Sequence, residues 1–396
     1  MKCVCSVTYS FLLNGAPQVS VIPTRGLRQG DPLSPYLFIL CTEVLSGLCN
    51  RAQARGDLPG IKVARQSPAI NHLLFADDTM FFCKANAACC ETLSKILSRY
   101  EAASGQCISV QKSAITFSAK TSLEVKQEVK RLMKIPNEGG VGKYLGLPEH
   151  FGRKKRDIFS SIVDRIRLKA NCWSSGFLSS AGKQVLLQAV LSATPTYIMS
   201  CFKLPLSLCK RIQSALTRFW WDEKPDKRKI CWVSWDKLTI PKNAGGLGFR
   251  EIERFNDAML AKIGWRILQA PESLLARILL GKYCHSSSFM ECQSPATASH
   301  GWRSILAGRD ILKQGLGWKV GNGEKIKVWL DPWLSSSSPS IPVGPAPVNA
   351  DSIYVKDLML PNGGWNLKAI REQIPHLEGS IRRIIIGKTT SPDSLV

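Results

Sequence analysis

The chain has 396 residues, of which 53 are Lys or Arg and 30 are Asp or Glu, so its formal net charge is +23. Hydrophobic residues make up 44% and charged residues 21% of the sequence, proportions that are typical of globular proteins and exclude a mostly disordered chain. The length favours two or three domains, no run of about 18 residues is apolar enough for a transmembrane helix, and the mildly apolar start lacks a convincing signal-peptide cleavage site.

The charge is uneven along the chain. Residues 1–120 carry +5, residues 121–260 carry +12 and residues 261–396 carry +6. A basic surface of this kind favours a polyanionic partner such as nucleic acid. The 14 cysteines are spread without a disulfide framework, which favours a reducing compartment.

The first informative segment, residues 26–49, combines a loop containing two glycines with a predicted helix. Asp31 followed by Pro32 is typical of a helix N-cap and first helical residue. Apolar residues then recur at helical spacing, so we predict a helix over 32–48. They are Leu33, Leu37, Leu40, Val44 and Leu48. The preceding loop, in which the glycines flank an Arg-Gln pair, is suited to close backbone approach to a ligand.

Residues 70–85 place short apolar stretches on both sides of an Ala-Asp-Asp sequence. This pattern predicts two strands joined by a turn, with Asp77 and Asp78 at the tip. Adjacent carboxylates repel each other, so a bound cation is one reason to hold them together. A solvated Asp-Asp turn without a ligand is the alternative that the dipeptide alone leaves open.

Helices and strands continue downstream. A helix is predicted over 86–103, ended by Ser-Gly, and a strand over 109–118 that contains Lys112. The sequence KYLGLP at 143–148 predicts a short apolar element with a tight glycine turn.

Two amphipathic helices are predicted in the basic middle of the chain, over 152–173 and 180–193. The first has isoleucines at helical spacing on one face. Its basic residues lie mostly on the other face, and they are Arg153, Lys154, Lys155, Arg156, Arg165, Arg167 and Lys169.

The last third of the chain is rich in tryptophan. We favour core packing for these side chains, with base stacking as the alternative for the four that flank a lysine-rich stretch, namely Trp220, Trp221, Trp232 and Trp235.

Helices are predicted over 255–268 and 272–280, a β-hairpin over 317–333, and a Ser/Pro-rich linker over 335–347. A loose group of cysteines and histidines lacks the paired spacing of zinc ligands, so we favour buried cysteines and surface histidines over a metal site. Its members are Cys284, His285, Cys292 and His300.

Taken in order, these segments resemble the reverse transcriptases of plant LINE-type (non-LTR) retrotransposons. The resemblance extends over nearly the whole chain, through GLRQGDPLSPYLF, FADD, QKSAITFS, KYLGLP, LSSAGKQVLLQAVLSATPTYIMSCFKLP, FWW, GGLGFR and GNGEKIKVWLDPW. It implies an α+β fold with a partial right-hand polymerase palm over 1–150, made of a β-hairpin and helices, and a mostly helical basic thumb over 151–220. A Trp-rich mixed connection region would follow over 221–334, then a linker and the start of a truncated downstream module over 335–396.

The resemblance also implies an activity, RNA-directed DNA polymerase, in which carboxylates on a rigid palm hold two Mg²⁺ ions for nucleotidyl transfer. Asp77 and Asp78 match the metal ligands, and Lys112 matches a lysine placed near the leaving phosphate. The remaining matches are Arg28, Gln29 and Gly30 for nucleotide and template, Tyr144, Leu145 and Gly146 for the primer, and the seven basic residues of the first amphipathic helix for the nucleic-acid backbone.

The implied partners are an RNA template, a DNA primer or an RNA–DNA hybrid, and deoxynucleoside triphosphates. No membrane is implied, and the expected location is the nucleus or cytoplasm.

The sequence departs from the family's pattern at the metal site. The family has a third aspartate on an earlier palm strand, whereas residues 1–25 contain no Asp or Glu, and we expect that strand, the fingers and an endonuclease domain to lie upstream. Ser109 also stands where the family more often has Asn. These departures predict a polymerase fragment or decayed copy that is inactive alone. A non-catalytic nucleic-acid-binding remnant and a structural fragment without function are the alternatives.

Overall fold

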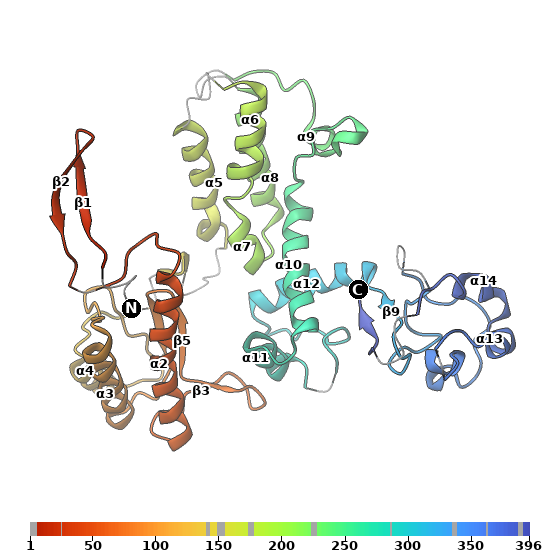
Figure 1. The fold of residues 1–396 in the computed structure, drawn as a ribbon, viewed down its shortest axis with the longest axis horizontal. Coiled ribbons are helices and arrows are strands. Elements are labelled where there is room, and N and C mark those ends of the chain that lie inside the picture. The colour runs from red at the N-terminus through yellow and green to blue at the C-terminus, as the bar shows by residue number, and fades with distance from the viewer. Residues whose placement is uncertain are drawn as a thin grey trace. The chain divides into compact units, whose positions relative to one another are not determined.

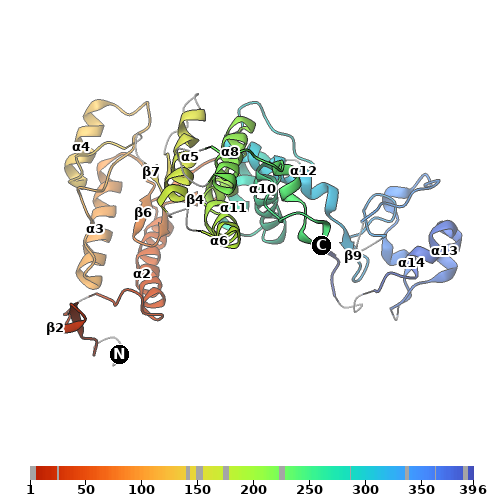
Figure 2. The same ribbon diagram turned by 90° about the horizontal axis from the view of Figure 1, so that it is seen from above.

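The computed structural model describes residues 6–24, 26–139, 143–148, 155–172, 178–222, 228–285, 287–334, 339–361, 363–386 and 391–396. The chain divides into two compact units: unit 1 comprises residues 1–158 with 272–286, and unit 2 comprises residues 159–271 with 287–396. Helices dominate both units, and the sheets within the described residues are antiparallel pairs of strands (Figures 1 and 2). The fold class is therefore α+β, as predicted.

Unit 1 opens with a hairpin of β1 (Tyr9–Leu13) and β2 (Ala16–Val21). Asn14 and Gly15 join the strands with φ of 48° and 82°, the left-handed backbone that an Asn-Gly hairpin turn requires. Every residue of β2 is exposed, and the hairpin stands clear of the unit's helices in Figures 1 and 2. It therefore contributes little to the core.

The core of unit 1 lies between α2 (Ser34–Arg55) and α3 (Ala87–Ser104), both of which the sequence predicted. The Asn86 side chain caps α3 by accepting from the Cys89 N–H at 2.9 Å. Helix α2 starts two residues later than predicted and continues to Arg55, because its buried stripe runs on through Ala52. A further helix that we did not predict, α4 (Leu123–Met133), packs against α3.

Three short strand pairs and one helix complete unit 1. The pairs are β3 (Ile61–Lys62) with β4 (Ala69–Ile70), β5 (His72–Phe75) with β6 (Asp78–Phe81), and β7 (Lys143–Tyr144) with β8 (Leu147–Pro148). Helix α11 (Leu274–Tyr283), which the sequence predicted over 272–280, belongs to this unit although it is distant in sequence.

Unit 2 is mostly helical. Its helices are α5 (Lys155–Cys172, from Phe159 onward), α6 (Ser180–Leu186) with one π-helical turn η2 (Leu187–Leu191), α7 (Thr196–Cys201), α8 (Leu206–Trp221), α9 (Trp235–Thr239), η3 (Lys242–Ala244), α10 (Ile252–Gln269) and α12 (His300–Gly315). Helix α10 packs against α7, α8 and α12. None of the helices in the described residues is both long and apolar enough to cross a bilayer.

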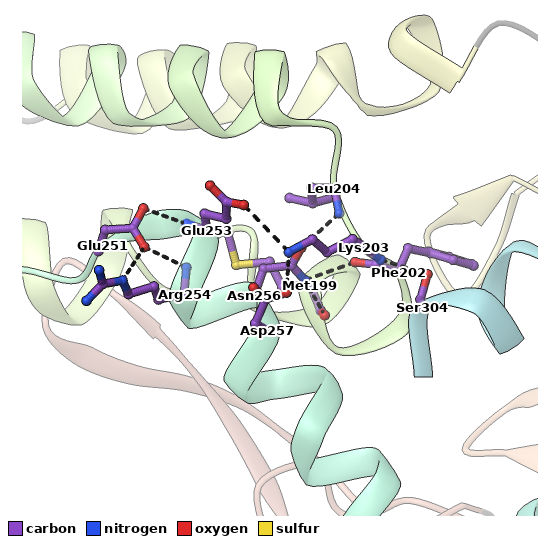
Figure 3. A network of polar contacts seen from close by, with 10 residues as sticks. All are labelled: Met199, Phe202, Lys203, Leu204, Glu251, Glu253, Arg254, Asn256, Asp257 and Ser304. Atoms are coloured by element: carbon purple, nitrogen blue, oxygen red, sulfur yellow. Dashed lines mark hydrogen bonds and ion pairs between the residues drawn. The ribbon is translucent and has the colours of Figure 1, made fainter. Parts of the chain in front are cut away.

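A buried asparagine joins α10 to α7 and to the chain that follows it (Figure 3). Asn256 is fully buried, and its amide donates to the carbonyl oxygens of Met199 and Phe202 at 2.8 and 3.0 Å. Its side-chain oxygen accepts from the Leu204 N–H at 2.8 Å. Lys203 forms an ion pair with Asp257 one residue further along α10. The 199–204 segment is thereby held to the helix by polar bonds as well as by packing.

The end of unit 2 has its own core, which we call the C-terminal core. It brings together residues from both sides of the predicted Ser/Pro-rich linker, including Val328 and Trp333 before it and Val355 and Ile370 after it. Around it lie η4 (Ala350–Ser352), η5 (Val355–Leu358), α13 (Leu367–Gln373), η6 (Pro375–Leu377) and α14 (Glu378–Ile381).

The predicted hairpin over 317–333 is wrong. Strand β9 (Trp318–Lys319) pairs instead with β10 (Ser394–Leu395). The reason is the buried Asp393, whose carboxylate accepts from the backbone N–H groups of Gly321, Gly323 and Lys325 at 2.8 to 2.9 Å. These bonds draw the Asn-Gly loop toward the distant segment and leave it no local partner strand.

Among the described tryptophans four are buried and five are half-buried, which bears out core packing for only part of them. Those with relative exposures of 5% or less are Trp235, Trp302, Trp329 and Trp333. Trp232 is the exception, with 79% of its surface exposed.

Candidate functional site

The two adjacent aspartates lie at the tip of a hairpin, as predicted. Strands β5 and β6 pair in antiparallel register, with Phe75 opposite Asp78 and Leu73 opposite Met80, so Ala76 and Asp77 form the turn. Ala76 takes a φ of 48° to close it. Both Asp77 and Asp78 are exposed, so their carboxylates are accessible to a cation.

Two polar residues fix this hairpin to α2. Asn71 is buried and donates to the Cys49 carbonyl at 2.8 Å, while the Ser46 hydroxyl and His72 Nε2 are 2.9 Å apart. Burial lowers the pKa of His72 below its ordinary value of 6.5, and the carboxylate of Glu43 opposes that shift. Sequence reasoning missed these residues, although an Asn-His pair inside an otherwise apolar strand was a visible signal.

The turn implied for the primer lies near the same tip. Tyr144 ends β7, and Leu145 and Gly146 turn the chain with φ of 50° and 77° before β8 begins. Burial and the nearby carboxylate of Asp78 both raise the pKa of Tyr144. The Tyr144 phenol therefore lies within electrostatic range of the Asp78 carboxylate, although the two residues are distant in sequence.

The loop implied for nucleotide and template is exposed. Arg28, Gln29 and Gly30 all face solvent, and Gly30 has a φ of 85°. The Asp31 carboxylate accepts from the Leu33 N–H at 2.7 Å, which is a cap-like bond just before α2. Within the described residues no hydrogen bond or ion pair joins the loop to the aspartate hairpin.

Lys112 is exposed in a turn, and the strand predicted over 109–118 is wrong. The amide of Asn137 donates to the carbonyls of Gln111 and Ser113, both at 3.1 Å, and holds the backbone in a curl that a strand would not allow. The described side chains show no hydrogen bond or ion pair between Lys112 and either aspartate of the hairpin.

The basic helix is present as α5. Its described part buries Ile162 and Ile166 and leaves Arg165, Arg167 and Lys169 exposed, which agrees with the predicted two-faced pattern. The other four basic residues of the prediction lie outside the residues whose side chains are described; they are Arg153, Lys154, Lys155 and Arg156.

A magnesium ion suits the chemistry of the hairpin tip only in part. Carboxylate oxygens are donors that Mg²⁺ prefers, and Asp77 and Asp78 supply them side by side. Yet among the described residues no group of three or more His, Cys, Asp or Glu side chains could enclose a metal. The pair therefore supplies only part of the ligand set that a two-metal site uses.

The loose Cys/His group, too, contains no three side chains that could enclose a metal ion within the described residues. Cys292 is buried and its thiol donates to the Phe289 carbonyl at 3.3 Å, while the His300 ring stacks on Phe202. His285 is exposed, and its Nδ1 is 3.2 Å from Gln66 Oε1. These contacts account for Cys292, His300 and His285 in terms of packing and hydrogen bonding.

Comparison with known proteins gives a family match over the N-terminal part. Residues 2–148 match the family described as "Reverse transcriptase (RNA-dependent DNA polymerase)". All of the hairpin and loop residues discussed above, from Arg28 to Gly146, fall inside this range.

Three relatives come from Arabidopsis thaliana. "Uncharacterized mitochondrial protein AtMg00310" is 47% identical over 152 residues, which are 38% of this chain and 99% of that protein. "Putative ribonuclease H protein At1g65750" is 35% identical over 224 residues, 55% of this chain and 36% of that protein. "Uncharacterized mitochondrial protein AtMg01250" is 74% identical over 76 residues, 19% of this chain and 62% of that protein.

The chain thus spans about a third of the second relative and under two thirds of the third. It covers nearly all of the first at 47% identity, and its N-terminal part matches the reverse transcriptase family. Residues 2–148 are therefore similar to reverse transcriptase domains, and the chain belongs to the family of the mitochondrial protein AtMg00310.

Proposed function

We propose that this chain is part of an RNA-directed DNA polymerase of the plant LINE-type, non-LTR class. The observation that carries the proposal is the exposed Asp77–Asp78 pair at a two-residue turn, inside the range that matches reverse transcriptases. Tyr144 lies within electrostatic range of Asp78. Residues 1–150 would form a partial palm, 151–220 the thumb, 221–334 the connection region, and 335–396 a linker and the start of a further module.

In this proposal the residues of the hairpin, the turn and the loop take the roles that the resemblance implies. Asp77 and Asp78 would hold Mg²⁺, and the chemistry that the ion would supply is activation of the primer hydroxyl and stabilisation of the leaving pyrophosphate. Tyr144 and the turn after it position the primer end, and Gln29 with its neighbours contacts nucleotide and template. The substrates are an RNA template, a DNA primer and deoxynucleoside triphosphates.

We further propose that these 396 residues alone do not extend a primer. Two metal ions in fixed geometry need more ligands than one pair of carboxylates, and the described residues add no third acidic or imidazole group to the pair. We expect no extension of a DNA primer on an RNA template with Mg²⁺ or Mn²⁺. Extension that is lost in Asp77→Ala would show that the site is complete.

Metal binding tests the hairpin directly and does not depend on catalysis. Titration calorimetry with Mn²⁺ should detect weak binding to the chain that disappears in the double variant Asp77→Asn, Asp78→Asn. The matched control is Asp57→Asn, Asp236→Asn, which removes the same charge from two exposed positions elsewhere. Equal Mn²⁺ binding by both double variants would contradict the proposed role of the hairpin.

A non-catalytic nucleic-acid-binding protein is the second candidate. It is favoured by the charge of +12 on residues 121–260 and by the exposed Arg165, Arg167 and Lys169 on α5. This function needs phosphate contacts but no metal. Nucleic-acid binding without Mn²⁺ binding at the hairpin would select it over the polymerase.

A further inference from the structure

A depression on unit 1 lies outside the aspartate hairpin and its neighbours. It has a volume of about 410 Å³ and is formed where the loop between β3 and β4 meets helix α11. All of its lining residues belong to unit 1. The loop returns through β4, which ends at Ile70, just before β5 starts the aspartate hairpin, so the depression and the hairpin share one continuous stretch of chain.

The floor of this depression is a fixed structure. Ser67 is 3% exposed, and its hydroxyl donates to the Ile278 carbonyl of α11 at 3.0 Å. A Cβ on Gly281 would lie 2.8 Å from the Gln66 carbonyl oxygen, so glycine is required for the loop backbone to lie against the helix. Because backbone contacts set the distance between loop and helix, the side chains on the rim project from defined positions.

The rim is positively charged and has no acidic partner among the described residues. Lys62, Arg65 and Arg277 line the depression, and all are exposed. No salt bridge joins any of them to another described residue, and none of the lining residues is Asp or Glu. Like charges gathered without a counter-charge repel each other, so a bound anion would stabilise this arrangement.

The remaining lining residues indicate which anion fits. None of them is aromatic, so the depression has no platform on which a base could stack. A nucleoside triphosphate binds together with Mg²⁺, and protein sites usually coordinate that ion through one or two carboxylates. No carboxylate lines this depression. Two guanidinium groups and an ammonium group instead match the phosphates of a strand backbone, which Arg binds through paired N–H donors.

We propose that Lys62, Arg65 and Arg277 form a binding site for the phosphodiester backbone of a nucleic-acid strand. The site uses no residue of α5 and recognises phosphate without reading bases. The inference rests on the proposed function in that nucleic acid is the substrate.

The test compares two triple variants of the full chain. The pocket variant is Lys62→Gln, Arg65→Gln, Arg277→Gln, and the control is Lys120→Gln, Lys237→Gln, Lys368→Gln, which removes equal charge from exposed lysines without ion pairs among the described residues. Binding of a labelled mixed-sequence DNA duplex is followed by anisotropy between roughly 50 and 200 mM salt. In the pocket variant the negative slope of log affinity against log salt should become less steep by about 2 to 3, which is about 0.9 for each phosphate that is no longer bound. In the control the slope should become less steep by less than about 0.9.

Equal slopes for the two triple variants would overturn the proposed site. If the parent binds and a variant of α5 loses affinity while the pocket variant does not, nucleic-acid binding stands and this site fails. A parent without affinity for any nucleic acid would remove both proposals.

A footprint on the unaltered chain covers the case in which the pocket variant does not fold. Bound duplex should protect Lys62 from acetylation at least several-fold more than it protects Lys120, and tripolyphosphate at equal phosphate concentration should not. Protection by tripolyphosphate but not by duplex would overturn a strand-binding site in favour of a free-polyphosphate site.

Discussion

His72 links the stability of the aspartate hairpin to pH. Its ring lies between Ser46 and Asn71, at 2.9 and 2.5 Å, and is partly buried. Because burial lowers its pKa below 6.5 in the folded state, the unfolded chain takes up a proton more readily than the folded chain does. The contribution of His72 to the free energy of unfolding is therefore complete above pH 6.5 and is lost as the pH falls below that value.

We predict that unit 1 loses stability between pH 7 and pH 5.5 because of this histidine. One group changes the free energy of unfolding by at most about 1.4 kcal/mol per pH unit. Urea unfolding of the parent should show this loss, and His72→Gln, which has no titrating group, should show a smaller pH dependence although its stability at neutral pH is also lower. Identical pH profiles for the two proteins would contradict the assignment.

The crossing of α10 and α12 depends on the absence of a side chain at one position. A Cβ on Gly308 would lie 2.3 Å from the Leu260 carbonyl carbon and 2.4 Å from the Ala261 nitrogen. Both atoms belong to helix backbone and have little freedom to move away. Any residue other than glycine at this position therefore requires the two helices to separate.

We predict that Gly308→Ala lowers the free energy of unfolding of unit 2 by about 1 to 3 kcal/mol, the range for overpacked cores. Gly315→Ala is the matched control on the same helix, because a Cβ there meets no atom within 4 Å. Chemical denaturation followed by tryptophan fluorescence measures both, since Trp302 on α12 is fully buried. A control that is destabilised as much as Gly308→Ala would contradict the role of the crossing, because alanine is a better helix former than glycine and its helix propensity cannot cause the loss.

Local sequence signals were sufficient for some elements and not for others. Asn86 and Gly105 mark both ends of α3, and the aspartate hairpin follows from its two apolar flanks. The apolar face of α2 was predicted less well, since Leu40 and Val44 are 64% and 58% exposed while Cys49 is buried. Helical spacing gives the period of a helix but not which neighbours it meets.

Errors arose where one distant side chain reorganises a segment. Asn137 curls the chain around Lys112, and Asp393 holds the Asn-Gly loop near β10. Neither bond has a signal in the local pattern, because the partners are 26 and 72 residues apart in sequence. The residues of the candidate site were therefore identified by resemblance, whereas the proximity of Tyr144 to Asp78 needed the structure.

At the scale of the whole molecule, part of the net charge of +23 lies on an exposed helix face that suits the phosphates of a nucleic acid. The described part of α5 presents Arg165, Arg167 and Lys169 to solvent opposite a buried isoleucine face. Phosphate contacts made by such residues fix a strand without selecting its sequence. The chain should therefore bind nucleic acids in a salt-dependent and sequence-independent way.

We predict that Arg165→Gln, Arg167→Gln, Lys169→Gln weakens binding to all duplex sequences alike. The slope of log affinity against log salt should flatten by about 0.9 for each phosphate that these side chains no longer bind. Anisotropy with two unrelated duplexes measures this, with the Lys120, Lys237, Lys368 variant as the control of equal charge. A loss of affinity confined to one duplex would indicate base recognition, and an unchanged slope would show that this face serves only solubility.

The pairing of β9 with β10 has a mechanical consequence. Gly317 and Val396 exchange two backbone hydrogen bonds, at 3.0 and 2.8 Å, so both ends of the C-terminal core meet at one point. Tension applied through α12 and through Val396 would pull the two strands apart sideways and break their bonds one after another. Such a junction opens at lower force than strands sheared along their length, and the Asp393 contacts with Gly321, Gly323 and Lys325 would be the next to be loaded.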